Sequence, residues 1–127
     1  MKTEITPANA LKPKAPYSYG ILSEGMIFTS GQIHVTPEGK LLEGTIEEQT
    51  HQVMRNLKSI LDAAGASFAD VVKTTIYLTD MSFYGKVNEV YASYLSEPFP
   101  ARETICVKEL PSGARIEISM IAFKPGS

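Results

Sequence analysis

The sequence predicts an α+β fold in which one β-sheet carries two helices on a single face. Three kinds of segment predict it: runs rich in β-branched residues, two stretches with apolar residues at helical spacing, and turns marked by glycine or proline. In chain order they read βββ-α-β-α-ββ, which gives six strands. With 127 residues, 43% apolar and 20% charged, the chain is long enough for one domain, residues 1–127, with its own core.

The first three strands follow an extended lead-in over residues 6–16, which contains three prolines. Two strand-like runs flank the pair Glu24-Gly25, which is typical of a tight hairpin turn. A third run continues the sheet and ends at a turn over residues 36–39. The three predicted strands are 19–23, 26–30 and 32–35.

The clearest helix spans residues 45–64. Thr45 and Glu48 form a capping box, in which each side chain satisfies a free backbone amide of the first turn, and Gly65 ends the helix. Apolar residues recur along one side, so this side must pack against the sheet. The apolar residues are Ile46, Val53, Leu57, Ile60, Leu61 and Ala64.

The remaining chain predicts a strand, a second helix and two final strands. The strand 71–78 is rich in β-branched residues. Asp80 or Ser82 can cap the helix 83–95, and prolines at 98 and 100 prevent its continuation. The apolar side of that helix carries Val87, Val90, Tyr91 and Tyr94. The final strands are 102–110 and 115–123, separated by Pro111-Ser112-Gly113.

Composition disfavours several classes of function. The net charge of −2 and the absence of any run of basic residues disfavour nucleic acid as a partner. The single cysteine, Cys106, cannot form an internal disulfide, which fits a reducing compartment. The chain shows no signal region, and no window approaches the roughly 20 apolar residues of a membrane span. We therefore expect a cytoplasmic protein without a membrane partner.

Two helices cover only one face of such a sheet, yet the last strand is apolar on both sides. Ile116, Ile118 and Met120 share one face, and Ile121 and Phe123 share the other. A strand that is apolar on both faces is usually buried on both. We therefore expect the protein to form an oligomer through its uncovered face.

Arg102 and Glu117 are the first candidates for chemistry, because both are ionisable groups among apolar neighbours. An arginine suits a carboxylate ligand, and a half-buried glutamate can position water or carry a proton. For either residue, a structural salt bridge is the alternative; for Glu117 the partner would be Arg115 or a lysine across the sheet. Alternation places Arg102 with Thr104 and Cys106 on one face of the strand. Ile105 and Val107 on the other face are expected to face the helices, so Arg102 is expected on the interfacial side.

Arg102 and Glu117 can form one site only if the last two strands are not direct neighbours or if two subunits contribute. In a simple hairpin of the last two strands, Arg102 would face roughly residue 122, well over 10 Å from Glu117. A joint site therefore requires non-adjacent strands or two subunits.

Three further positions are candidates for lining a cleft, and each has a structural alternative. Gly31 in Ser30-Gly31-Gln32 allows close approach to a ligand or marks a bend. Tyr17 and Asn88 are polar residues that can reach a cleft. No residue spacing indicates a metal site, and His34 and His51 form no catalytic constellation with each other. We expect His51 to face solvent and Cys106 to be a packing residue.

Several short motifs, in this order along nearly the entire chain, resemble the RidA family, also called the YjgF or L-PSP family. They are Pro16-Tyr17, Thr29-Ser30-Gly31-Gln32-Ile33, Val72-Lys73-Thr74-Thr75, Val87-Asn88, Pro100-Ala101-Arg102 and Ile116-Glu117-Ile118. The resemblance implies a chorismate-mutase-like single domain with a six-stranded mixed sheet. It also implies a strand between the last two, and a homotrimer with clefts between its subunits.

The resemblance further implies a cofactor-free enamine/imine deaminase. Its substrates would be small 2-imino carboxylates formed from 2-aminoacrylate or 2-aminocrotonate, and its products 2-keto acids and ammonia. By the same resemblance, Arg102 would bind the substrate carboxylate and Glu117 would position water. Tyr17, Ser30, Gly31, Asn88 and Thr104 would line the cleft.

Two positions depart from the family pattern. Glu103 stands where the family has a small residue, and Thr104 where it has a cysteine. We expect the Thr104 backbone amide to remain available to a carboxylate, and Glu103 to point to the opposite face. The alternatives are a non-catalytic metabolite-binding or chaperone-like protein and the endoribonuclease activity with which the family has been labelled.

Overall fold

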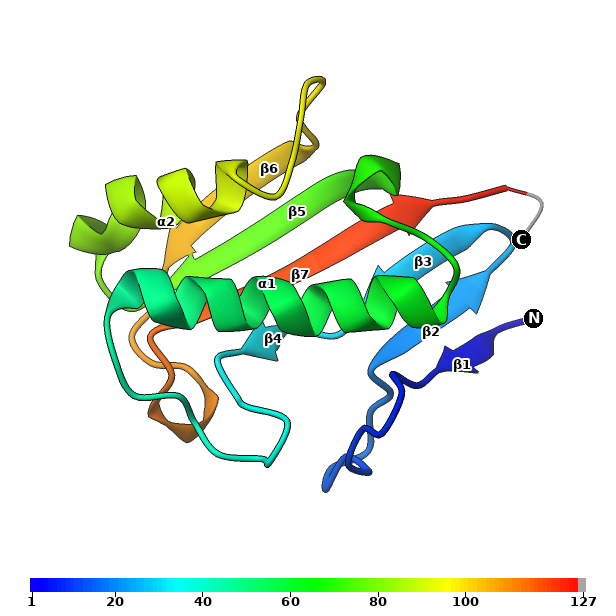
Figure 1. Ribbon diagram of the computed structural model, residues 1–127, viewed down its shortest axis with the longest axis horizontal. Helices are drawn as coiled ribbons and strands as arrows, with labels where there is room; N and C mark the ends of the chain where they lie inside the picture. Colours follow the sequence, from blue (N-terminus) through cyan, green and yellow to red (C-terminus); the bar gives the residue numbers. More distant parts are fainter. Residues whose placement is uncertain (126–127) are drawn as a thin grey trace.

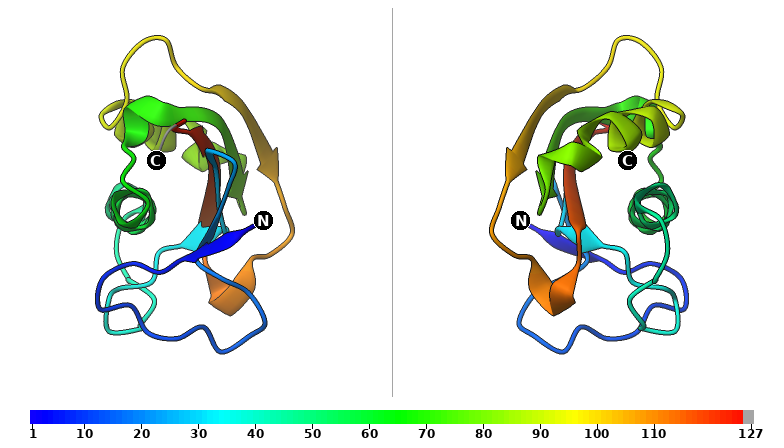
Figure 2. Two further views of the ribbon diagram at one scale, coloured as in Figure 1. Left: turned by 90° about the vertical axis from the view of Figure 1, so that its right-hand side faces the viewer. Right: turned by 90° about the vertical axis from the view of Figure 1, so that its left-hand side faces the viewer.

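A computed structural model describes residues 1–125 and confirms the α+β fold, a mixed sheet with two helices (Figure 1). Edge-on views show both helices on the same side of the sheet (Figure 2). Within residues 1–125 the strands are β1 (Thr3–Ile5), β2 (Gly20–Ser23), β3 (Met26–Thr29), β4 (Gln32–Ile33), β5 (Val71–Leu78), β6 (Ala101–Cys106) and β7 (Ile116–Phe123). The helices are α1 (Ile46–Ala63) and α2 (Tyr84–Ala92), with short 3-10 turns η1 (Phe68–Asp70), η2 (Met81–Phe83) and η3 (Pro111–Gly113).

The order of the strands separates the last two. Along the sheet the order is β1-β2-β3-β7-β5-β6, and β4 also pairs with β7. Strand β5 is parallel to β6 and antiparallel to β7, so it lies between them. The intervening strand implied by the family resemblance is therefore confirmed, and β6 forms an edge of the sheet.

The prediction from the sequence missed one strand and made others too long. β1 pairs with β2, so the sheet has seven strands within residues 1–125, where six were expected. A three-residue strand is too short to produce a periodic signal. The strand expected to reach residue 110 ends at Cys106, and that expected to reach Val35 ends at Ile33. The helix expected over 83–95 is Tyr84–Ala92, and Asp80 caps the 3-10 turn before it by accepting from the Ser82 amide.

The predicted hairpin and the first helix are confirmed. Glu24 and Gly25 both have positive φ, 50° and 81°, as the tight turn between β2 and β3 requires. At the start of α1, the Glu48 amide donates to Thr45 Oγ1 at 3.1 Å and the Thr45 amide donates to Glu48 Oε1 at 2.8 Å. Local signals in the sequence therefore set the two elements that flank β4.

The core lies between α1 and the sheet. Leu57, Ile60 and Leu61 of α1 are fully buried in one cluster with Ile116 and Ile118 of β7. The opposite face of the sheet has no helical cover, and it leaves apolar side chains partly exposed. Phe28 is 42% exposed, Ile105 43% and Phe123 44%.

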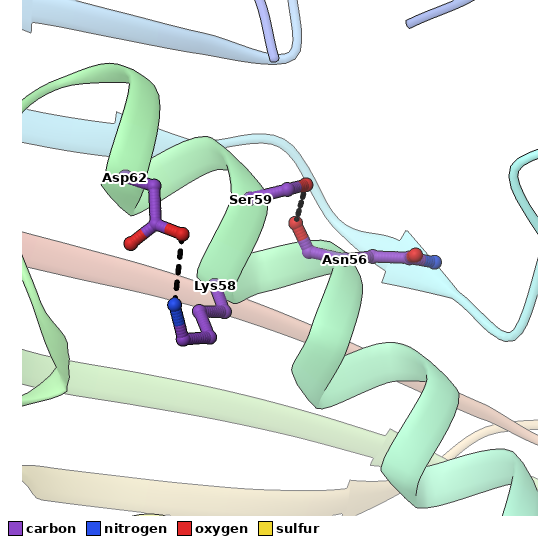
Figure 3. Close-up of polar contacts among 4 residues, drawn as sticks. All are labelled: Asn56, Lys58, Ser59 and Asp62. Atoms are coloured by element: carbon purple, nitrogen blue, oxygen red, sulfur yellow. Dashed lines mark hydrogen bonds and ion pairs between the residues drawn. The ribbon is translucent and has the colours of Figure 1, made fainter. Parts of the chain in front are cut away.

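Asn56 connects α1 to the loop after β4. Its side-chain Nδ2 donates to the carbonyl oxygens of Ile33 at 3.1 Å and Val35 at 2.9 Å. Figure 3 shows this side chain directed toward β4, while Lys58 and Asp62 form an exposed ion pair of 2.8 Å elsewhere on the helix. Asn56 therefore holds β4 at the place where the candidate site begins.

We predict that Asn56→Ala lowers the free energy of unfolding by about 2 kcal/mol, because two hydrogen bonds to half-buried carbonyl groups are lost, although the Ile33 carbonyl keeps the Val35 amide as a donor. Chemical denaturation measures the change. Lys58→Ala is the matched control on the same helix, and it should change stability by less than about 1 kcal/mol because its ion pair is exposed. Equal effects of the two substitutions would contradict the role of Asn56.

Candidate functional site

The structure gathers four of the predicted site residues around one cleft. Its volume is about 350 Å³, and it lies beside β4 on the uncovered face of the sheet. Tyr17 comes from the lead-in, Ser30 and Gly31 from the β3–β4 junction, and Glu117 from β7. Ile33 and Pro111 complete the lining.

Backbone contacts fix the β3–β4 junction. The Ser30 amide donates to the Tyr19 carbonyl at 2.8 Å, and the Ser30 hydroxyl donates to the Ser18 carbonyl at 2.5 Å. Next to it, β4 pairs with β7, which sets Ile33 opposite Glu117. The junction therefore faces the Glu117 side chain across the cleft.

Gly31 allows the Glu117 carboxyl group to take its observed position. A Cβ at position 31 would lie 2.7 Å from the Glu117 Cδ, closer than non-bonded atoms allow. The close approach suggested by the sequence is therefore an approach to the carboxyl group of this chain. Glycine leaves the room in which that carboxyl group sits.

Glu117 is a half-buried carboxyl group without a cationic partner. Burial raises the pKa of Glu117 above its ordinary value. Within residues 1–125 no lysine or arginine lies within ion-pair distance of it, so the salt-bridge alternative is wrong for these residues. Arg115 instead donates to Gln49 Oε1 at 2.8 Å and to the Gly44 carbonyl at 3.1 Å. A raised pKa makes the carboxylate a stronger base, which suits the transfer of a proton from water.

Arg102 lies in a second cluster, formed by β6 and α2. Its Nη1 donates to Asn88 Oδ1 at 2.8 Å and its Nη2 to the Tyr84 hydroxyl at 3.1 Å. The guanidinium carbon is 5.6 Å from the centre of the Tyr84 ring and 5.2 Å from that of Tyr91. Within residues 1–125 no carboxylate forms an ion pair with Arg102, so its salt-bridge alternative is also wrong there.

The predicted face of Arg102 is wrong. Arg102 pairs in register with Thr74, which is fully buried under the helices, so Arg102 points to the helical side. The sequence interpretation took the apolar Ile105 as helix-facing, but Ile105 is 43% exposed on the open face. In an edge strand next to a short helix, tyrosines and an asparagine provide the cover for the arginine, and apolar alternation no longer marks the core.

Thr104 lies two residues along the same face as Arg102. Its Oγ1 is buried and has no hydrogen-bond partner within residues 1–125. The Val107 amide donates to the Leu78 carbonyl at 2.8 Å, and amides alternate along a strand, so the Arg102 and Thr104 amides point to the free edge. Glu103 points to the opposite face, as expected, and its carboxylate lies 3.5 Å from Lys73 Nζ.

The two clusters do not meet within one chain. Thr74 stands in register with both Arg102 and Met120, so Glu117 lies two strands across and three residues along from Arg102. Each offset is about 10 Å, and the two side chains leave the sheet on opposite faces. One chain therefore presents two separate halves of a candidate site.

Neither histidine lies in the cleft. His34 is buried; its Nδ1 lies 3.0 Å from the Leu42 carbonyl, and its Nε2 accepts from the Arg115 amide at 3.0 Å. Burial lowers the pKa of His34, which keeps the ring neutral. His51 was expected to face solvent, but it is only half-exposed and its Nδ1 lies 2.7 Å from the Tyr94 hydroxyl.

Cys106 does not line the cleft. It was expected to be a packing residue, but in the single chain it is exposed at the end of the edge strand. Within residues 1–125 no group of three or more histidine, cysteine, aspartate or glutamate side chains is arranged to hold a metal ion. In the same range no helix is long and apolar enough to cross a membrane.

The sequence interpretation missed Tyr84 as a site residue and treated Tyr91 only as part of an apolar helix face. A signal for both was present. Tyr84 is four residues before Asn88 and Tyr91 three residues after it, so the three side chains share one helix face.

This chain is similar in sequence and in structure to known proteins. Residues 7–124 match the family model described as Endoribonuclease L-PSP. The human 2-iminobutanoate/2-iminopropanoate deaminase is 41% identical over 121 residues, covering 94% of this chain and 88% of the human protein. A Thermotoga maritima crystal structure has a TM-score of 0.94 at 46% identity, covering 99% of this chain and 100% of that one. E. coli TdcF with bound serine has a TM-score of 0.89 at 33% identity, covering 96% and 98%.

We predict that Glu117→Gln raises the free energy of unfolding at pH 7 but not below about pH 4. The folded-state pKa of Glu117 is raised, so its ionised form opposes folding at high pH, and this penalty disappears when both states are protonated. Denaturant titrations at the two pH values measure the difference. The control is Glu38→Gln in an exposed turn, for which we expect less than about 0.5 kcal/mol at either pH. An equal gain from Glu117→Gln at both pH values would contradict the prediction.

Proposed function

Because the chain belongs to the RidA (YjgF, L-PSP) family, we propose that it hydrolyses small 2-imino acids to 2-keto acids and ammonia. The observation that carries the proposal is that the chain presents two complementary half-sites. One is an arginine held in place by Asn88, and the other is a carboxyl group of raised pKa in a cleft. The name of the human relative supports the chemistry, since it specifies 2-imino acids. The reaction assigned here needs only water as co-reactant.

Arg102 would bind the substrate carboxylate. Two of the five guanidinium N–H groups are bonded to Asn88 and Tyr84, and the others have no partner within residues 1–125, which leaves them available to a ligand. The Thr104 amide points to the same free edge and adds a donor. A small carboxylate can accept from these groups, and the serine bound to the E. coli relative is a small ligand that carries a carboxylate.

Glu117 would act as the proton carrier. The substrate enters as the protonated imine, and the Glu117 carboxylate takes a proton from water as the water oxygen bonds to the imine carbon. The electron pair of the C=N bond moves to the nitrogen, which gives a neutral carbinolamine. The protonated Glu117 then gives its proton to the amino group, the carbon–nitrogen bond breaks and ammonia leaves, and the hydroxyl proton passes to the Glu117 carboxylate as the keto group forms. Burial suits this exchange, because it brings the pKa of Glu117 nearer to neutral. Tyr17 and Ser30 would shape the cleft around the substrate.

A homotrimer would unite the two halves. Phe28, Ile105 and Phe123 leave apolar surface on the uncovered face, which a second copy can bury. In a ring of three copies, the Arg102 cluster at the β6 edge of one copy would adjoin the Glu117 cleft of the next. The separation of the halves within one chain supports this arrangement.

We predict that the protein shortens the lifetime of 2-iminobutanoate generated by a dehydratase, and that Arg102→Ala reduces kcat/KM about 100-fold. The estimate assumes two charge-assisted hydrogen bonds to the carboxylate, together about 3 kcal/mol. Following the decay of the imine gives the rate. The matched control, Arg55→Ala on the exposed side of α1, should retain full activity.

An unchanged imine lifetime in the presence of the protein would contradict the proposal. If calorimetry then showed 2-keto acid binding, a non-catalytic binding protein would replace it. The description of the family model also suggests RNA cleavage. The cleft, however, has no acid–base pair of histidines within residues 1–125, because His34 is buried and neutral and His51 is bonded to Tyr94.

We predict a solution mass of three chains and activity in mixtures of two inactive variants. When Arg102→Ala and Glu117→Gln chains are unfolded and refolded together, about a quarter of the sites should combine an intact Arg102 with an intact Glu117. Light scattering and the imine assay measure the two results. Each variant refolded alone is the control. A monomer mass, or no activity in the mixture, would contradict a site shared between copies.

A further inference from the structure

Tyr84 contacts Arg102 and takes no part in the proposed proton transfers. Its hydroxyl accepts a hydrogen bond from Arg102 Nη2 at 3.1 Å, and its ring lies beside the guanidinium group. Tyr84 is the first residue of α2 and is 40% exposed. The hydroxyl therefore lies at the surface, next to the free donors of Arg102.

The Tyr84 hydroxyl has a proton to give. A phenol can accept and donate at the same time, and here it accepts from Arg102. Within residues 1–125 no acceptor receives the Tyr84 proton. Tyr91 differs, because its hydroxyl donates to Thr74 Oγ1 at 2.9 Å and its side chain is buried. Tyr91 therefore offers Arg102 only its ring.

Several donors of this cluster have no acceptor within residues 1–125. The Asn88 carbonyl oxygen accepts from one guanidinium N–H group, and other guanidinium N–H groups, the outward amides of β6 and the Tyr84 proton are left without an acceptor. The buried Thr104 Oγ1 also lacks a partner in the same range. Unpaired donors gathered beside a positive charge match a carboxylate, whose two oxygens accept several hydrogen bonds.

We propose that the Tyr84 hydroxyl donates a hydrogen bond to the substrate carboxylate and, with Arg102, makes the site selective for acids over uncharged analogues. This inference rests on the proposed function, since it assigns a further residue to the same site. It makes Tyr84 a determinant of specificity. Tyr84 takes no part in the proton transfers at the imine carbon.

The test compares an acid with its neutral analogue. Calorimetry with 2-oxobutanoate and 2-oxobutanamide is carried out on the parent protein, on Tyr84→Phe, and on Tyr94→Phe as a control at a phenol outside the site. We expect Tyr84→Phe to weaken 2-oxobutanoate binding about tenfold, the loss expected for one charge-assisted hydrogen bond. Binding of 2-oxobutanamide should weaken by less than about twofold, since a neutral acceptor loses less. Tyr94→Phe should change neither.

Kinetics provide the second measurement. Tyr84→Phe should raise KM for 2-iminobutanoate while kcat stays near the parent value, because the lost contact is made equally in the ground state and the transition state. Phenylalanine keeps the ring beside Arg102, and thermal unfolding verifies that the variant is folded. Equal losses for the acid and the amide, or no loss for either, would overturn the role of Tyr84 alone. A parent protein that binds no 2-oxobutanoate would overturn the proposed function as well.

Discussion

The position of β7 in the sheet is the constraint on which the rest of the molecule depends. β7 pairs with β3, β4 and β5, and its alternate residues supply the centre of the core beneath α1. The same alternation brings Glu117 out on the uncovered face, opposite β4. Because β7 is bonded along both edges, the Glu117 backbone cannot shift, and Gly31 leaves room for its carboxyl group. The pairing of β7, which the fold requires, therefore sets the position of Glu117, the candidate proton carrier.

Arg102 is positioned by side-chain contacts with α2, whereas Glu117 is positioned by the pairing of its strand. It lies on an edge strand, where one side of the backbone has no strand partner, and its charge is balanced by an amide oxygen, a phenol and two aromatic rings. These groups orient the guanidinium without neutralising it, since none carries a negative charge. An anion that reaches the edge therefore finds an arginine whose side chain is already ordered. The entropy of ordering it has been lost on folding and does not weaken binding.

Short-range signals in the sequence were sufficient for several elements. The capping box of Thr45 and Glu48 and the Glu24-Gly25 turn were predicted because each depends on contacts within a few residues. The strand 71–78 was predicted from its β-branched residues, although its partners β6 and β7 are distant in the sequence. The face of Arg102 was predicted wrongly, because it depends on how β6 pairs with β5 and on the tyrosines that α2 places above it. Tyr84 was missed for the same reason. Its proximity to Arg102 arises only when α2 packs beside the edge strand.

The central claim is that one active site takes its arginine from one copy of the chain and its glutamate from another. A crystal structure of the assembled protein with 2-oxobutanoate tests this most directly. We expect the ligand carboxylate within hydrogen-bond distance of Arg102, and the keto carbon next to the Glu117 carboxyl group of an adjacent copy. A ligand bound by Arg102 and Glu117 of the same chain, or one whose carboxylate does not contact Arg102, would contradict the claim.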